Sequence, residues 1–310
     1  MGRELHGTVL RATAGFFEVD TDEGVLTCKL RGRLKKVKKK TDLCVIGDRV
    51  RLTLVDDEQQ GLQGVIEEVE PRRTVFSRRH PGRGGRFKED VLVANLDQLI
   101  VVFAFRDPPF HPRMLDRFLV IAEQNGIDAL VVMNKLDQVD DTQRDQALVY
   151  EGLGYPVHLV SATSGAGLGA LRERLGGRIS AFVGPSGAGK SSLLNALDPE
   201  LALRVGETSE SHGKGRHTTR VATLHPVHVD GAAGYVADTP GIRELGTWDL
   251  PESELDRCFP EMRPHLGRCG FRNCVHVHEP DCAVKAAVEA GAIRAERYDS
   301  YVRMLADEER

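Results

Sequence analysis

The sequence predicts a multidomain protein: an N-terminal all-β barrel, a central α/β domain on a parallel sheet, and a helical C-terminal domain that binds metal. Short β-type runs punctuated by Gly and Asp fill the first 75 residues. From Gln98 to about Thr247, apolar strands alternate with helical segments, and a Cys/His cluster interrupts the helical last sixty residues. We expect domains at 1–75, 76–250 and 251–310, which a chain of 310 residues can accommodate.

Composition is that of a globular protein, with 41% hydrophobic and 28% charged residues. The net charge of −4 gives no general sign of nucleic-acid binding, but eight Lys or Arg and no acid lie between Lys29 and Lys40. Any RNA contact by the barrel should therefore be local and made to phosphates, with a solvated charged loop as the alternative. No apolar run has the length of a membrane span and the N-terminus is not a signal peptide, so we expect a cytoplasmic protein with no membrane partner.

The N-terminal region has five runs of strand character, at 7–10, 15–19, 25–30, 48–54 and 64–69. Five strands in so short a segment favour a small closed barrel of the OB-fold type. The Gly/Arg-rich stretch from Arg78 to Arg86 is expected to be a linker or loop.

The central region has five short apolar strands, at 99–104, 129–133, 157–160, 179–183 and 235–237, with 221–224 as an extra edge. Fully apolar strands between amphipathic helices predict a parallel sheet covered on both faces.

A phosphate loop follows the fourth of these strands. The run Gly184-Pro-Ser-Gly-Ala-Gly-Lys-Ser fits G-x-x-x-x-G-K-[ST] and leads into a helical segment. Its backbone N–H groups would converge on phosphate oxygens, Lys190 would reach the β- and γ-phosphates and stabilise charge there, and Ser191 would ligate Mg²⁺. A ligand-free Gly-rich turn is the alternative. The predicted phosphate-binding residues are Gly184, Pro185, Ser186, Gly187, Ala188, Gly189, Lys190, Ser191 and Ser192.

Two further segments indicate that the base is guanine. Asn134-Lys135-Leu-Asp137 follows the second strand, and the Asp137 carboxylate can accept from N1–H and the exocyclic amine of guanine, which adenine does not offer. Ser161-Ala162 ends the next strand and would place a backbone N–H near the guanine oxygen. Either segment alone is weak, and an exposed loop is the alternative; together with a phosphate loop they become specific.

The run Asp238-Thr-Pro-Gly241 follows the last strand, where Asp238 would assist Mg²⁺ and the Gly241 N–H would face the γ-phosphate. A plain turn is the alternative. In ordinary GTPases the phosphate loop comes first; here the guanine segments precede it, which predicts a circularly permuted P-loop GTPase. A parallel sheet tolerates this order because each loop lies at the carboxyl end of its strand.

The run from Ser211 to Arg220 has the glycines and charges of a switch segment. Thr218 or Thr219 should close on Mg²⁺, and we favour Thr219. Ile242 stands where many GTPases carry a water-orienting Gln, so we take His217 as the nearest candidate for the catalytic group, with an exposed loop histidine as the alternative.

A metal cluster follows near the C-terminus. Cys269-x₄-Cys274-x-His276-x₅-Cys282 offers three thiolates and an imidazole, which is typical of a tetrahedral structural zinc site. Buried free cysteines are the alternative, and spacing alone leaves His278 as a competing fourth ligand.

The combination of these motifs resembles the family of ribosome small subunit-dependent GTPase A, also called RsgA or YjeQ. The resemblance includes the permuted order, Val93-Ala-Asn-Leu-Asp-Gln-Leu-Ile, Gly215-Arg-His-Thr-Thr and the cysteine spacing. It implies GTP hydrolysis stimulated by the small ribosomal subunit during late maturation, rRNA contacts by the barrel and zinc domain, catalysis by His217, and one zinc held by Cys269, Cys274, His276 and Cys282. GTP, GDP and the small subunit are the expected partners of a monomer; a nucleotide-gated RNA-binding protein and a GTPase of the large subunit are the alternatives.

Overall fold

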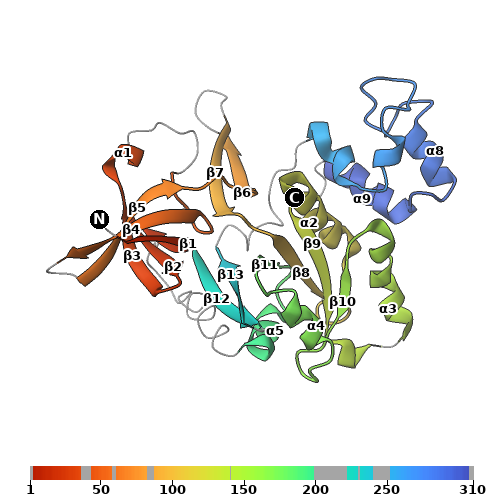
Figure 1. The fold of residues 1–310 in the computed structure, drawn as a ribbon. Coiled ribbons are helices and arrows are strands. Elements are labelled where there is room, and N and C mark those ends of the chain that lie inside the picture. Colours follow the sequence, from red (N-terminus) through yellow and green to blue (C-terminus); the bar gives the residue numbers. More distant parts are fainter. Residues whose placement is uncertain are drawn as a thin grey trace, which may run out of the picture.

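The computed structural model describes residues 3–35, 43–57, 61–81, 87–139, 141–198, 222–229, 231–239 and 252–306. Figure 1 shows a β-rich N-terminal part, a central α/β part and a helical C-terminal part that lies beside α2.

The N-terminal part is a five-stranded barrel made of β1 (Glu4–Thr13), β2 (Phe16–Thr21), β3 (Gly24–Leu30), β4 (Arg49–Asp57) and β5 (Gly61–Val69). The strands follow the order β1-β2-β3-β5-β4, and β4 pairs back onto β1, which closes the barrel. Alternate residues such as Val9, Val19 and Leu52 point inward and are fully buried. The predicted small barrel is confirmed, with the short helix α1 (Gly32–Lys35) after β3.

A two-stranded antiparallel sheet follows, made of β6 (Val75–Pro81) and β7 (Phe87–Ala94). The expectation of a linker or loop over Arg78–Arg86 is wrong for residues 78–81, which pair with 87–90. Strand pairing uses backbone groups, which Arg and His supply as well as any residue, so composition misled the prediction here. Residues 82–86 lie outside the described ranges.

The central sheet contains β8 (Gln98–Ala104), β9 (Asp128–Asn134), β10 (Val157–Leu159), β11 (Ile179–Val183), β12 (Thr223–Val229) and β13 (Ala232–Asp238), in the order β10-β9-β8-β11-β13-β12. Five of these strands are parallel and β12 is antiparallel to β13. The five predicted strands are confirmed, and the predicted edge appears as β12.

Helices cover both faces of this sheet. They are α2 (Pro112–Asn125), α3 (Asp141–Leu148), α4 (Leu168–Glu173) and α5 (Lys190–Leu197), with the 3-10 turns η1 (Leu136–Gln138) and η2 (Glu151–Leu153). Residues of β8 alternate between two cores: Leu99, Val101 and Phe103 pack with α2, whereas Ile100 and Val102 pack with α4 and α5. This alternation explains why β8 reads as an unbroken apolar run.

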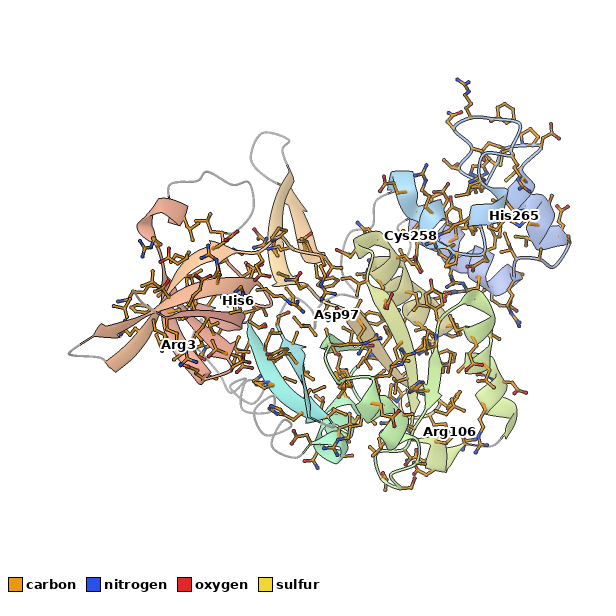
Figure 2. All side chains as sticks on the ribbon, in the orientation of Figure 1. Arg3, His6, Asp97, Arg106, Cys258 and His265 are labelled. Atoms are coloured by element: carbon orange, nitrogen blue, oxygen red, sulfur yellow. The ribbon has the colours of Figure 1, made fainter. Side chains whose placement is uncertain are left out.

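Side chains between the barrel and the central sheet tie the two parts together. Asp97 lies at this junction (Figure 2), where it accepts from the Ile179 backbone N–H at 2.8 Å and from the Arg73 guanidinium at 2.9 Å. The buried Asn95 amide donates to the Gly47 carbonyl at 2.9 Å. The barrel is therefore held against the start of β8 and β11.

The C-terminal part consists of η4 (Glu252–Cys258), η5 (Arg263–His265), α8 (Ala283–Glu289) and α9 (Ala295–Leu305). Phe259, Met262 and Tyr301 form its core together with Val120 of α2. Arg297 of α9 is buried and donates to both Asp116 of α2 and Glu261, each at 2.6 Å. Within the described ranges, every helix falls short of the length and apolar character needed to cross a bilayer.

Candidate nucleotide-binding site and metal centre

Every predicted nucleotide segment in the described ranges follows the carboxyl end of a strand in the central sheet. The segment 134–137 comes after β9, 161–162 after β10 and 184–190 after β11, and Asp238 ends β13. Because these strands are parallel, their carboxyl ends share one edge, and segments from distant parts of the chain meet there.

The phosphate loop is seated directly on β8. Gly184 has a φ of 132°, and a Cβ built there would lie 2.0 Å from the Val102 carbonyl oxygen. Gly189, with a φ of 87°, precedes the first residue of α5. Only glycine fits both positions, so these two glycines let the loop approach the strand and turn into the helix.

The cationic and hydroxyl groups of this loop gather at the start of α5. The Lys190 ammonium donates to the carbonyl oxygens of Gly184 and Pro185, both at 2.7 Å, so it curls back over the loop. Ser191 and Ser192 lie exposed in the first turn of the helix, and Ser186 lies exposed in the loop. Backbone N–H groups at a helix start, a Lys and hydroxyls form a surface suited to a polyphosphate and its Mg²⁺.

Asn134 connects three of the loops. Its buried side-chain amide donates to the Ala188 carbonyl and its oxygen accepts from the Ala162 N–H, both at 3.1 Å. A Cβ at Gly189 would lie 2.3 Å from the Asn134 amide nitrogen, so the loops are in close contact. Asn134 therefore holds the phosphate loop and the two guanine segments in one arrangement.

Ser161 orients the carboxylate expected to read the base. Its hydroxyl donates to Asp137 Oδ1 at 2.5 Å and accepts from the Ser164 N–H at 3.0 Å. Sequence reasoning assigned to Ser161-Ala162 only a backbone contact, and it missed this side-chain role.

A further loop at this edge was missed altogether. Asp107 and Pro108 follow the end of β8, where the Asp107 carbonyl accepts from the Lys135 ammonium and Pro108 lies close to Gly187. The sequence could have indicated this loop, because it follows the carboxyl end of a strand in the central sheet, as the other nucleotide segments do.

Asp238 is buried at the end of β13, next to the strand that carries the phosphate loop. His217, Thr218, Thr219 and Gly241 lie outside the described residues, so their predicted roles remain predictions.

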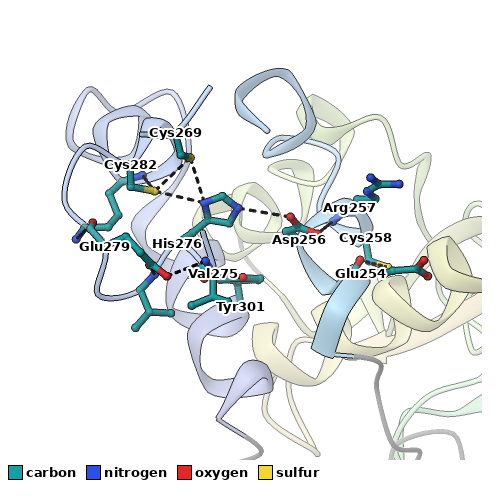
Figure 3. A network of polar contacts seen from close by, with 12 residues as sticks. Glu254, Asp256, Arg257, Cys258, Cys269, Val275, His276, Glu279, Cys282 and Tyr301 are labelled. Carbon is teal, nitrogen blue, oxygen red and sulfur yellow. Dashed lines mark hydrogen bonds and ion pairs between the residues drawn. The ribbon is translucent and has the colours of Figure 1, made fainter. Parts of the chain in front are cut away.

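The four predicted metal ligands meet in the C-terminal part, and Figure 3 shows three of them, Cys269, His276 and Cys282. One ligand atom from each of Cys269, Cys274, His276 and Cys282 lies within 4.8 Å of the others. A tetrahedral zinc site with Zn–S bonds of about 2.3 Å needs S–S separations of about 3.8 Å. Cys269 Sγ lies 3.9 Å from Cys282 Sγ and 3.6 Å from His276 Nδ1, so the donor set fits a tetrahedral cation. His278 is exposed and does not belong to this group.

Surrounding groups hold His276 in place. Its backbone has a φ of 63°, its carbonyl accepts from the Tyr298 hydroxyl at 2.6 Å, and its Nε2 faces Asp256 Oδ2 at 3.5 Å. Such a carboxylate behind a metal-bound imidazole fixes the ring orientation and leaves Nδ1 for the ion. Sequence spacing gave no sign of Asp256 or Tyr298.

The Cys274 thiol of the cluster resists ionisation unless a cation is present. Burial and the neighbouring thiols of Cys269 and Cys282 raise the pKa of Cys274 to about 12. A metal ion supplies the positive charge that thiolates at this spacing need. Nearby, backbone N–H groups including those of Val275 and Val277 lower the pKa of Glu279 to about 2, which keeps this turn anchored by a carboxylate.

The fold and the two centres define a circularly permuted P-loop GTPase with an N-terminal barrel and a C-terminal Cys/His cluster. Residues 69–248 match the family model described as RsgA GTPase, and residues 6–62 match the RsgA N-terminal domain. The chain belongs to the RsgA family of GTPases, which hydrolyse GTP.

Relatives and solved structures agree with this assignment. The small ribosomal subunit biogenesis GTPase RsgA of Gemmatimonas aurantiaca is 47% identical over 301 residues, covering 96% of this chain and 95% of that protein. The protein of the same name from Moorella thermoacetica is 42% identical over 303 residues, covering 98% and 97%. The crystal structure of YjeQ from Thermotoga maritima matches with a TM-score of 0.75 and 36% identity over 98% of both chains. YloQ, a circularly permuted GTPase, matches with a TM-score of 0.73 and 29% identity over 98% of this chain and 95% of that one.

Proposed function

We propose that this protein is a maturation factor of the small ribosomal subunit that hydrolyses GTP and is stimulated by that subunit. The observation that best supports GTP binding is the pair of hydrogen bonds made by the Asn134 side chain, which hold the guanine segments and the phosphate loop together despite their permuted order. The relatives support the ribosomal role, since they are named as GTPases of small-subunit biogenesis.

The proposed site binds guanine through Asp137, supported by Ser161, with Asn134, Lys135 and Ala162 around the base. The phosphates lie along Gly184–Ser192, with Lys190 on the β- and γ-phosphates, and Ser191 ligates Mg²⁺. Asp238 assists Mg²⁺ from the end of β13. This assignment follows the roles that P-loop GTPases give to these residue types.

We place catalysis on His217 and Lys190, with Thr219 or Thr218 closing on Mg²⁺ and the Gly241 N–H facing the γ-phosphate. Sequence position supports these roles, because His217 adjoins the candidate switch threonines and Ile242 has no group that orients water. Lys190 and Mg²⁺ stabilise the charge that develops on the transferring phosphoryl group.

In the C-terminal part, Cys269, Cys274, His276 and Cys282 would hold one structural zinc ion, which adds to the apolar core around Phe259 and Tyr301 in keeping this part folded. We assign rRNA contacts to the basic run Arg31–Lys40 of the barrel and to the zinc-bearing part. We place the domain boundaries near residues 75 and 250. A cytoplasmic monomer fits this role.

Single-turnover GTP hydrolysis with and without purified small subunits tests the proposal. We expect subunits to raise the rate at least about tenfold, because a general acid–base group positioned on demand contributes on the order of 100-fold or more. The variant His217→Ala should keep its GTP affinity and lose the stimulation, whereas His228→Ala, exposed at the end of β12 away from Asp238, should keep both. Equal rates with and without small subunits, or stimulation by large subunits alone, would contradict the proposed function.

A further inference from the structure

Tyr235 of β13 reaches out of the central sheet into the barrel. Its hydroxyl donates to Asp20 Oδ2 of β2 at 2.8 Å. Asp20 is the register partner of Thr8 on β1, and Thr8 is the register partner of Arg49 on β4, so the tyrosine is hydrogen-bonded to a strand that is paired into the barrel. Burial and the Asp20 carboxylate raise the pKa of Tyr235 to about 12, which keeps the phenol proton in place as the donor.

A second contact joins the same two parts by backbone pairing. Arg11 of β1 is the register partner of Thr223 of β12, and Thr223 is the register partner of Asp238 of β13. The barrel edge and Asp238 are thus separated by a single intervening strand. The barrel and the carboxyl end of β13 therefore belong to one continuous hydrogen-bonded sheet.

The position of β13 decides where Asp238 stands relative to the phosphate loop. β13 runs parallel to β11, with Tyr235 opposite Ile179 and Ala237 opposite Ala181, and β11 ends where the phosphate loop begins. Tyr235 lies three residues before Asp238, about 10 Å along an extended strand. A strand transmits a small displacement along its length, so a shift at Tyr235 would move Asp238.

We propose that Tyr235 is a positioning residue for GTP hydrolysis: its hydrogen bond to Asp20 fixes β13 to the barrel and sets the place of Asp238 beside the phosphate loop. This inference rests on the role of Asp238 in the proposed function. It makes the barrel part of the hydrolysis machinery, because any partner that shifts the barrel acts on Asp238 through Tyr235.

Single-turnover GTP hydrolysis and GTP affinity in the full-length protein test the inference. Tyr235→Phe removes the hydroxyl and keeps the ring. We expect the hydrolysis rate to fall about threefold to tenfold, as the loss of one hydrogen bond implies, with GTP affinity unchanged. Tyr155→Phe is the matched control, since Tyr155 is a buried tyrosine of the central part, in the connection before β10, whose hydroxyl donates to Glu123 at 2.9 Å, away from the barrel; its rate should stay within about twofold.

Variants of the partner separate positioning from a structural defect. Asp20→Ala should lower the rate as Tyr235→Phe does, Asp20→Asn should restore most of it because an amide oxygen still accepts, and the double variant Tyr235→Phe/Asp20→Ala should be no slower than either single one. An unchanged rate in Tyr235→Phe, additive losses in the double variant, or a loss of GTP affinity equal to the loss of rate would overturn the inference. These measurements need no ribosome, so a wild-type protein that small subunits fail to stimulate would contradict the proposed function alone.

Discussion

Arg297 shows how a single buried charge joins distant parts of the chain. Its guanidinium contacts Asp116, 181 residues away, and Glu261, and it lies over the Phe259 ring at 4.6 Å from the centroid. The Tyr150 hydroxyl also donates to Asp116, at 2.8 Å. Two carboxylates and an aromatic ring compensate the buried cation, and these contacts seat α9 against α2.

We predict that Asp116→Ala destabilises the protein by about 3 kcal/mol, because removing one partner leaves the buried guanidinium undercompensated. The thermal midpoint should fall by roughly 5–10 °C. Asp299→Ala is the control: its ion pair with Arg113 is exposed, with side chains 44% and 49% accessible, and should contribute less than about 1 kcal/mol. Thermal unfolding followed by circular dichroism measures both, and equal midpoints for the two variants would show that the buried position of Asp116 has no special importance.

At the scale of elements, strands and motifs could be predicted where the information is local. The phosphate loop, the guanine segments and the cysteine spacing each lie in a short run, and the position of the nucleotide segments after apolar strands placed those segments at one sheet edge. Contacts between elements could not be predicted in this way. Tyr235 and Asp20 are 215 residues apart, and Asp256, whose carboxylate faces the His276 ring, belongs to η4 and not to the cysteine-bearing loop. Composition also misled the prediction at Arg78–Pro81, where backbone pairing forms a strand.

The metal-bearing segment offers a prediction at this scale. We expect one zinc ion per chain by mass spectrometry of the native protein, with the thiols of Cys269, Cys274 and Cys282 becoming reactive when a chelator removes the ion. The other three cysteines should stay unreactive in the folded protein, since burial raises their pKa, to about 11 for Cys28 and Cys258.

Matched serine variants sharpen this test. Cys274→Ser should lose most of the zinc, whereas Cys258→Ser, a buried cysteine of the same core, should keep it. Zinc retained in full by Cys274→Ser, or the same thiol reactivity before and after chelation, would be inconsistent with a four-ligand site.

At the scale of the whole molecule, the order of the strands in the sheet decides where the nucleotide segments lie, and the order of the motifs in the chain does not. The sheet order β10-β9-β8-β11-β13 places the guanine segments on one side of the phosphate loop and Asp238 on the other. The permutation has a further consequence. The metal-bearing part follows Asp238 in the sequence, whereas β13, which carries Asp238, is hydrogen-bonded to the barrel. One nucleotide site thus lies between the two parts that we expect to contact rRNA.

The most direct test of a guanine site built from permuted segments is the nucleotide preference of Asp137→Asn, measured by equilibrium binding of GTP and XTP. An amide nitrogen repels the exocyclic amine of guanine but can donate to the 2-oxygen of xanthine. We predict that GTP affinity falls about 100-fold or more and XTP affinity rises to within about tenfold of the wild-type value for GTP. Asp128→Asn, at the opposite end of β9, should bind GTP as the wild type does. Unchanged GTP affinity in Asp137→Asn, or wild-type protein that binds ATP as tightly as GTP, would contradict the account.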